Sequence, residues 1–114
     1  MITTSYCSEA LSDKLREKGY DGESTYMGKH GRVTYDNAIA FLRMAYKIEV
    51  FVEYNPIIVS VKKPVIEKWF AVCDFMDKRR SAFSRACVLD ADSYDEAREK
   101  AVMYVLEKYE MTEG

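Results

Sequence analysis

Residues 34–55, TYDNAIAFLRMAYKIEVFVEYN, contain a helix start, the apolar face of a helix and a strand in one continuous run. Thr34 is a favourable N-cap because its hydroxyl can accept a hydrogen bond from a backbone amide of the first turn, and Asp36 places negative charge near the positive end of the helix dipole. Apolar residues then recur at spacings of three and four, at Ala38, Phe41, Leu42 and Ala45. This spacing predicts a helix over residues 35–46 with one apolar stripe to bury.

After Lys47 the apolar period changes to two. One face of the resulting strand carries Ile48, Val50, Val52 and Tyr54. The opposite face carries Glu49 and Glu53, with the apolar Phe51 between them. Pro56 cannot donate a backbone hydrogen bond and therefore ends the strand. The alternation predicts a strand over residues 48–54 with one buried face.

Two further helices are predicted near the ends of the chain. In residues 6–18 apolar side chains recur four apart, and Gly19 suits the left-handed position that ends a helix in a Schellman motif. The last helix, residues 94–109, begins with the S-x-x-E spacing of a capping box at Ser93 and Glu96. Its predicted buried face consists of Ala97, Ala101, Val102, Val105 and Tyr109.

Residues 68–76 are apolar on both faces, which indicates a central strand. Trp69, Ala71, Cys73 and Phe75 alternate there with Phe70, Val72 and Met76. After a turn at residues 77–81, a third strand is predicted over residues 82–89, where Phe83, Cys87 and Leu89 alternate with Ser84, Ala86 and Val88. The apolar segment 56–64 fits either an extension of the first hairpin or irregular chain. Earlier in the chain, the glycine-rich residues 21–32 predict a loop with a short extended piece near residues 25–27.

These elements predict a single α+β domain over residues 1–114. A leading helix precedes an αβββα core, whose three strands form an antiparallel sheet with helices packed on one face. The core order is similar to the double-stranded-RNA-binding fold, by analogy of topology only. In that fold the last helix begins with a run of lysines, whereas the matching turn here is DADSYDE, which repels phosphate. The topology therefore does not imply RNA binding.

The composition indicates a soluble cytoplasmic protein. The chain has 17 basic and 19 acidic residues. This nearly neutral balance creates no overall electrostatic potential that would attract nucleic acid or an anionic membrane. Its three cysteines are an odd number at wide spacings, and the N-terminus lacks the apolar run of a signal peptide, so a reducing compartment is expected. No run approaches the roughly 20 apolar residues of a membrane span.

Four segments carry a family resemblance: LREKGYDGE, TYDNAIAFLRMAYKIEVFVE, WFAV and SYDEAREKAVMYVLEKY. Together they resemble a family of small uncharacterised proteins from gut Bacteroidales and their phages and prophages. Members of that family have a short helix ending in Lys-Gly-aromatic, a helix-to-strand segment with Leu-Arg, a Trp-aromatic strand and a capped C-terminal helix. The resemblance covers most of the chain and implies a protein of a phage or mobile element, without an assigned activity or functional residue.

The sequence offers no catalytic, metal-binding or cofactor-binding constellation, so we expect a protein that is not an enzyme and needs no cofactor. His30 is the single histidine and has no acid near it in the sequence. The cysteines Cys7, Cys73 and Cys87 lack the CxxC or HxxxH spacings of a zinc site and are expected to be buried thiols. The carboxylate pairs of the chain are explained by helix caps and by the solvent-exposed face of a strand.

Two surfaces remain as candidate sites. The second sheet face carries Phe51, Phe70, Val72 and Met76, which one leading helix would not fully cover, so we predict there a protein-partner site or a weak homodimer interface. The other surface is a basic cluster around the second hairpin, Lys78, Arg79, Arg80 and Arg85, which is the alternative nucleic-acid contact. Protein binding is the favoured function because charged turns are usually only solvated and four charges are few for gripping phosphates.

Overall fold

The computed structural model describes residues 5–22, 25–26, 29–54, 68–76 and 85–111. Its elements are, in order, α1 (Glu9–Glu17), β1 (Thr25–Tyr26), β2 (Lys29–His30), α2 (Tyr35–Ala45), β3 (Ile48–Tyr54), β4 (Trp69–Phe75), β5 (Arg85–Ala91) and α3 (Tyr94–Lys108). The α+β class and the leading helix followed by an αβββα core are confirmed. The apolar segment 56–64 and the turn at residues 77–81 lie outside the described residues.

The main sheet has three antiparallel strands in the order β3-β4-β5, so β4 is central, as its two apolar faces predicted. β5 begins at Arg85 and continues to Ala91, two residues beyond the predicted end. The predicted loop at residues 21–32 contains a short antiparallel pair in which Thr25 lies opposite His30. The sequence indicated an extended piece there but not its pairing partner.

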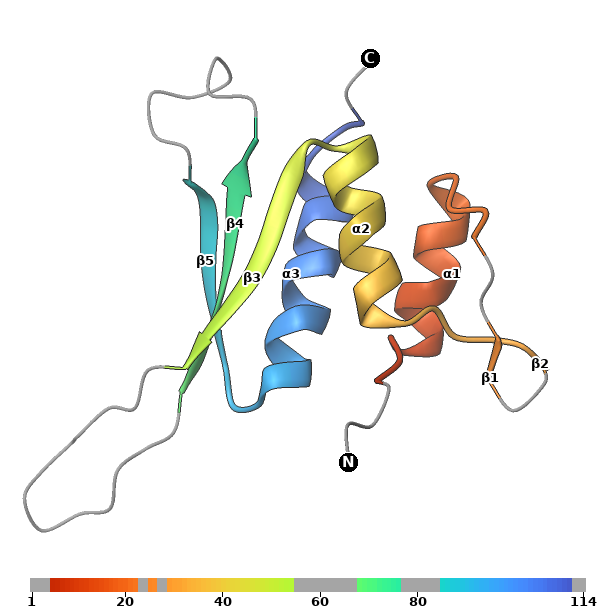
Figure 1. The fold of residues 1–114 in the computed structure, drawn as a ribbon, viewed down its shortest axis with the longest axis horizontal. Helices are drawn as coiled ribbons and strands as arrows, with labels where there is room; N and C mark the ends of the chain where they lie inside the picture. Colours follow the sequence, from red (N-terminus) through yellow and green to blue (C-terminus); the bar gives the residue numbers. More distant parts are fainter. Residues whose placement is uncertain (1–4, 23–24, 27–28, 55–67, 77–84, 112–114) are drawn as a thin grey trace, which may run out of the picture.

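All three helices lie on one side of the main sheet (Figure 1). α2 and α3 pack directly on the sheet, whereas α1 packs on α3. In Figure 1 α1 lies on the side of the helix layer that faces away from the sheet. We call the sheet face under α2 and α3 the inner face and the opposite one the outer face. Within the described ranges, each helix is too short or too polar to cross a lipid bilayer.

The hydrophobic core lies between the inner face and the helices. β3 and β4 contribute Ile48, Val50, Ala71 and Cys73, which are buried and alternate with outer-face residues. α3 contributes the small residues Ala97 and Ala101 together with Val102, Val105 and Leu106, all at most 1% exposed. The predicted buried face of the last helix is confirmed for its first four residues, and Tyr109 is partly buried beside it.

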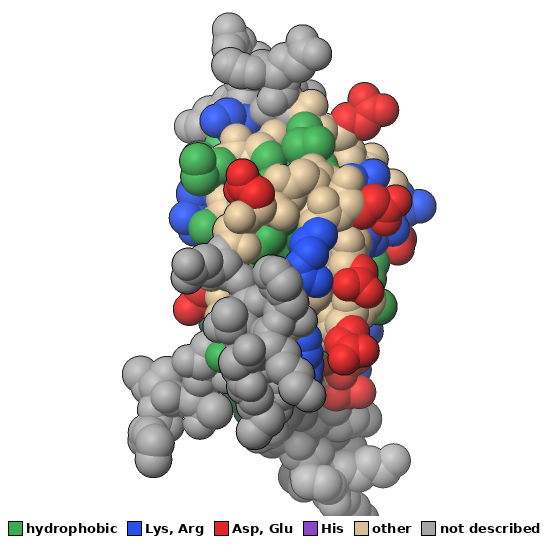
Figure 2. All heavy atoms as spheres, turned by 90° about the vertical axis from the view of Figure 1, so that its right-hand side faces the viewer, with side chains coloured by type: hydrophobic (Ala, Val, Ile, Leu, Met, Phe, Trp, Pro, Cys, Tyr) green, Lys and Arg blue, Asp and Glu red, His purple; other side chains and the backbone are tan. Residues whose placement is uncertain are grey.

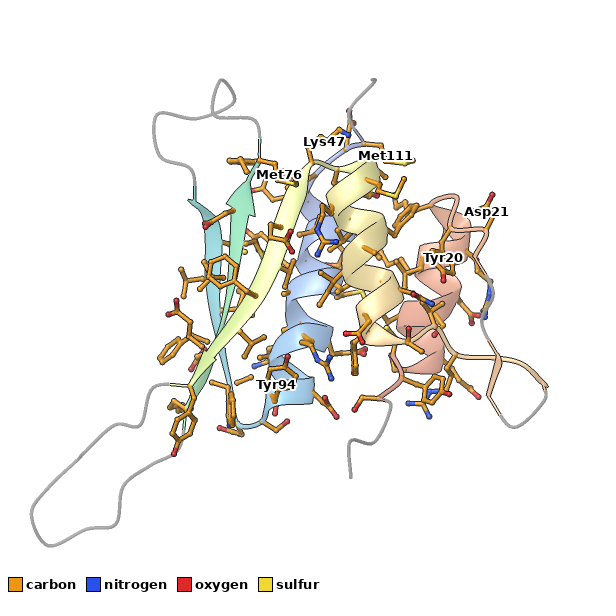
Figure 3. The ribbon with its side chains drawn as sticks, in the orientation of Figure 1. Tyr20, Asp21, Lys47, Met76, Tyr94 and Met111 are labelled. Carbon is orange, nitrogen blue, oxygen red and sulfur yellow. The ribbon has the colours of Figure 1, made fainter. Side chains whose placement is uncertain are left out.

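The connection between α2 and β3 consists of only two residues, Tyr46 and Lys47. Lys47 adopts a left-handed conformation with φ 56°, which reverses the chain directly from helix to strand. Its carbonyl oxygen accepts a hydrogen bond of 2.8 Å from the backbone N–H of Met76, just past the end of β4. Lys47 and Met76 lie close together at this end of the sheet in Figure 3. This hydrogen bond ties the turn between α2 and β3 to the residue that follows β4.

A tryptophan on a strand with two apolar faces is expected to be largely buried, but Trp69 is only partly buried in the structure. Its ring lies between the rings of Tyr54, with centroids 4.7 Å apart, and Tyr94, at 5.6 Å. The side chain thus packs at the end of the core rather than in its centre, because it stands at the first position of β4.

α1 ends as its sequence predicted. Gly19 has φ 104°, and the backbone N–H of Tyr20 donates to the carbonyl oxygen of Leu15 at 2.9 Å, the outer bond of a Schellman motif. The Tyr20 side chain packs against the core. The buried Ser12 accepts a hydrogen bond of 3.0 Å from the backbone N–H of Val33 through its Oγ. These contacts hold α1 beside the segment that leads into α2.

One carboxylate joins the three helices. Glu99 of α3 accepts hydrogen bonds from the backbone N–H of Ser8 at 3.1 Å and from Ser8 Oγ at 2.5 Å. It also accepts from the hydroxyl of Tyr35, the first residue of α2, at 3.0 Å. Ser8 is itself the N-cap of α1, since its Oγ accepts from the backbone N–H of Leu11. The starts of α1 and α2 are therefore both tied to the middle of α3.

We predict that Glu99→Ala lowers the free energy of unfolding by about 3 kcal/mol, because three donors lose a charged acceptor and two of them belong to a helix cap. Urea unfolding followed by circular dichroism measures this difference. Glu107→Ala is the matched control on the same helix. Its carboxylate makes an ion pair with Lys14 at 3.7 Å that is partly exposed, and it should cost less than about 1 kcal/mol. Equal losses for the two variants would contradict the role assigned to Glu99.

Candidate functional site

The outer face carries a row of apolar side chains across all three strands. Phe51 of β3 lies opposite Val72 of β4, and Val72 lies opposite Val88 of β5. Phe70 stands on the same face of β4, and Met76 follows the end of that strand. We call Phe51, Phe70, Val72 and Val88 the outer apolar patch. The candidate interface predicted from the sequence is therefore brought together, with Met76 at its margin.

The exposure of these side chains separates them from the core. Phe51 is 39% exposed, Val88 47% and Met76 50%. Val72 is only 1% exposed, yet it does not belong to the core cluster between the sheet and the helices. In the sheet register Val72 lies between Phe51 of β3 and Val88 of β5. The outer face thus has a buried apolar centre and exposed apolar walls, and every described helix lies on the other side of the sheet (Figure 1).

Val88 was not among the interface residues predicted from the sequence. Its alternation with Cys87 and Leu89 was noticed, but an exposed valine on one strand is an ordinary feature. Only the register shows that Val88 completes the row that begins at Phe51. The period of two in the sequence showed that Val88 lies on the opposite face from Cys87 and Leu89. It did not show which residue of the neighbouring strand lies beside Val88.

Carboxylates flank the outer apolar patch. Phe70 lies between Glu53 on β3 and Asp90 on β5, in the row next to Val72. At the other end of the face, Glu49 lies opposite Asp74. Both edge strands therefore place acidic side chains beside the apolar centre.

Two cations contact this acidic border from its margins. Arg43 of α2 binds Glu49 through Nε at 2.5 Å and Nη2 at 3.0 Å. Lys68 Nζ lies 3.7 Å from Asp90 and 3.3 Å from Asp92. The hydrogen bond to Asp92, more than any other contact, raises the pKa of Lys68 above its ordinary value. Glu53 makes no ion pair or hydrogen bond with any part of the chain that the structure describes.

The basic cluster cannot be placed as a surface. Lys78, Arg79 and Arg80 lie outside the described residues. The backbone of Arg85 begins β5, opposite Asp74 across a register shift, but its side chain lies outside the described part. The alternative nucleic-acid contact therefore stays a prediction from the sequence.

A hollow lies between α2 and the turn that follows α1. It has a volume of about 520 Å³, and its walls include Tyr20, Phe41 and Met44, with Asp21 and Asn37 among the lining residues. The rings of Tyr20 and Phe41 meet edge to face, with centroids 5.7 Å apart. Tyr20 and Asp21 are seen at the end of α1 in Figure 3. Its lining is mostly apolar, so the hollow could hold an apolar group.

The side of the molecule that carries α1 has a mixed surface. Figure 2 shows Lys, Arg, Asp and Glu interspersed there, with hydrophobic side chains in separate small groups. Such a surface is typical of an ordinary solvated face. The outer apolar patch, on the opposite side of the fold, differs from it because its apolar side chains are contiguous in the sheet register.

Arg98 is a buried cation at the start of α3. It is 8% exposed, and its guanidinium carbon lies 4.6 Å from the ring centroid of Tyr35 and 4.3 Å from that of Tyr94. Nη2 donates to Asp95 at 2.5 Å, and Nη1 lies 3.7 Å from Asp36. Two carboxylates and two aromatic faces balance the buried charge, so the arrangement links α2 to α3 rather than presenting a free cation.

The cysteines occupy core positions. Cys73 lies directly opposite Cys87 on the inner face, a proximity that the sequence did not reveal, and both thiols are free. Burial raises the pKa of all three thiols, that of Cys7 to about 12. This direction is opposite to the one that activates a nucleophilic cysteine. Among the described residues, no group of three or more His, Cys, Asp and Glu side chains could hold a metal ion.

His30 lies in the short strand β2 rather than in the loop that the sequence predicted. Its side chain lies outside the described part of the structure. A catalytic role for this histidine has no geometric support.

Comparison of the chain with protein-family models, curated proteins and solved structures gives no match. The resemblance to proteins of gut Bacteroidales and their phages stays a prediction from the four quoted segments. We therefore base the functional proposal on the geometry of the chain itself.

We predict that Cys7 and Cys73 resist alkylation in the folded protein near pH 8, because burial keeps both thiols protonated and inaccessible. The unfolded chain loses its thiol protons near the ordinary pKa of about 8.5, so the free energy of unfolding should fall as the pH rises above about 9. Mass spectrometry of iodoacetamide-treated protein, with and without urea, identifies the modified cysteines. Fast modification of Cys7 in the native state would contradict the burial of its thiol.

Proposed function

We propose that this chain is a small accessory or regulatory protein of a phage or mobile element that acts in the cytoplasm, without enzymatic activity, by binding another protein. The binding surface in this proposal is the outer face of the sheet. One observation carries it: Phe51, Val72 and Val88 form a continuous apolar row on the side of the sheet away from every described helix. The phage setting rests on the family resemblance alone.

The make-up of the outer apolar patch supports a protein ligand. Contiguous exposed apolar side chains bordered by polar ones are typical of protein interaction sites. At protein interfaces, the residues that contribute most of the binding energy are often aromatic and lie next to positions that are shielded from water. In the outer apolar patch, Phe51 is the exposed aromatic residue and Val72 is the position shielded from water. A partner that covers Phe51 and Val88 would complete a second hydrophobic layer on the sheet.

The titratable groups also favour binding over catalysis. The described tyrosines and cysteines with shifted pKa values are all shifted upward, chiefly by burial, among them Tyr35, Tyr46 and Cys73. An upward shift keeps a phenol or thiol neutral at physiological pH, whereas nucleophilic catalysis requires the anion. These groups serve the packing of the core.

We predict that the double substitution Phe51→Thr, Val88→Thr weakens partner binding at least tenfold, because it removes apolar contact area while keeping residues that favour strands. The partner is first captured from the cells that produce the protein, and its Kd is then measured with purified components by isothermal titration calorimetry. Met44→Thr is the control, since Met44 is 74% exposed but lies on α2. Loss of binding in the control, with binding retained in the double variant, would place the site elsewhere.

The alternative function is nucleic-acid binding through Lys78, Arg79, Arg80 and Arg85. Four cations can neutralise about four phosphates, and such contacts support only non-specific Kd values of about 10⁻⁴ to 10⁻⁶ M at physiological salt. The acidic residues beside β5 and at the start of α3 would oppose even this binding.

We predict no submicromolar binding to single- or double-stranded DNA or RNA at physiological salt. Fluorescence anisotropy at low and physiological salt tests this, since phosphate contacts on duplex DNA give a salt slope of about 0.9 per contact. Tight binding that survives physiological salt and disappears in the Arg79→Glu, Arg80→Glu variant would replace the protein-binding proposal with the nucleic-acid one.

A further inference from the structure

We infer that the outer face accepts one amphipathic α-helix of a partner protein, whose apolar stripe is flanked on both sides by Lys or Arg. This inference rests on the proposed function and names the chemistry of the partner. It depends on the width of the outer face and on the sign of the charges along its two edges.

The width of the face matches one helix. Neighbouring strands lie about 4.8 Å apart, so the two edge strands β3 and β5 are separated by about 10 Å, which is close to the diameter of an α-helix with its side chains. Val72 on the central strand is already covered, whereas Phe51 and Val88 on the edge strands are partly exposed. A helix lying along β4 would contact the partly exposed Phe70 beneath it and the exposed Phe51 and Val88 on either side.

The same sheet already binds helices in this way. α2 and α3 place apolar stripes on the inner face, and the exposed sides of both helices carry charged residues. The outer face shares the twist and the strand spacing of the inner one. We therefore expect an α-helix, rather than a strand or a loop, to fit the outer face.

The carboxylates on the two edge strands favour a partner helix with Lys or Arg on both sides of its apolar stripe. Glu53 stands on β3 and Asp90 on β5, so a helix between the two edge strands has carboxylates on both sides. Glu49, also on β3, is already paired with Arg43. Glu53 has no charged partner within the described residues. The Asp90 side chain is 65% exposed, and Lys68 Nζ lies 3.7 Å from its carboxylate. Lys or Arg residues beside the apolar stripe of the partner would pair with these carboxylates, whereas Glu or Asp residues would be repelled.

The same charges argue against a second copy of the chain as the occupant. Two outer faces packed against each other would bring the acidic borders of both copies into one interface. Like charges that lose water without gaining a partner oppose association. The homodimer predicted from the sequence is therefore the less favourable occupant of this surface.

Two designed peptides test the inference. Each is a helix of 18 residues, about 27 Å long, which spans a strand of seven residues. The two share one leucine stripe and differ only in the flanking positions, which are lysine in one peptide and glutamate in the other. Fluorescence anisotropy of the labelled peptides against the full chain gives the Kd values. We expect the lysine-flanked peptide to bind at least tenfold more tightly at low salt, with a smaller ratio at high salt.

Matched variants locate the contact. Glu53→Lys should weaken binding of the lysine-flanked peptide several-fold, and Phe51→Thr, Val88→Thr should abolish it. Glu17→Lys is the control, because it makes the same charge change at an exposed position of α1, on the far side of the helix layer. Equal affinity for the two peptides, or an equal effect of Glu17→Lys and Glu53→Lys, overturns the inference.

The remaining outcomes separate this inference from the proposed function. If neither peptide binds but the double variant loses the captured native partner, the outer face binds protein and the cationic helix is wrong. If sedimentation shows a dimer of the wild-type chain that the double variant lacks, the occupant is a second copy and the inference fails. If the native partner binds the double variant as tightly as the wild type, both the inference and the proposed function fail.

Discussion

The arrangement of the helices depends on the carboxylate of Glu99, which accepts two hydrogen bonds from Ser8 and one from Tyr35. A charged acceptor shared by the starts of two helices fixes both relative to α3. α1 is thereby held against the helix layer, although a helix of that length could also have covered the second face of the sheet. With α1 anchored there, all the described helices lie on the inner side of the sheet.

Packing on the inner face strengthens the same arrangement. α3 approaches the sheet through alanines, and α1 buries Leu11 and Leu15 against the helices. Moving α1 to the outer face would break the contacts of these leucines with the core and leave the Ser12–Val33 hydrogen bond unmade. The core cluster is formed by the inner face and the helices, without the outer apolar patch. The exposed Phe51 and Val88 are the part of that patch for which the proposed binding function would account.

Much of this architecture was readable from residues close together in the sequence. The caps at Thr34 and Ser93, the Schellman end at Gly19 and the change of period after Lys47 are all decided within one or two turns of chain. The apolar character of both faces of β4 marked it as the central strand. The positions of Phe51, Phe70 and Val72 on one shared face followed from the period of two. The place of Val88 did not, because an alternating pattern gives the faces of a strand and not its register.

The sequence by itself therefore determined the α+β class, the order of the elements and the side of each strand on which an apolar residue stands. Only the tertiary structure decided which side of the sheet α1 occupies, which residues of β3, β4 and β5 share a row, and that Cys73 meets Cys87. The physical reason is the range of the interactions. Caps and periodicity act between residues at most a few positions apart, whereas the bond that anchors α1 joins Ser8 to Glu99, 91 positions away, and depends on the packing of every element between them.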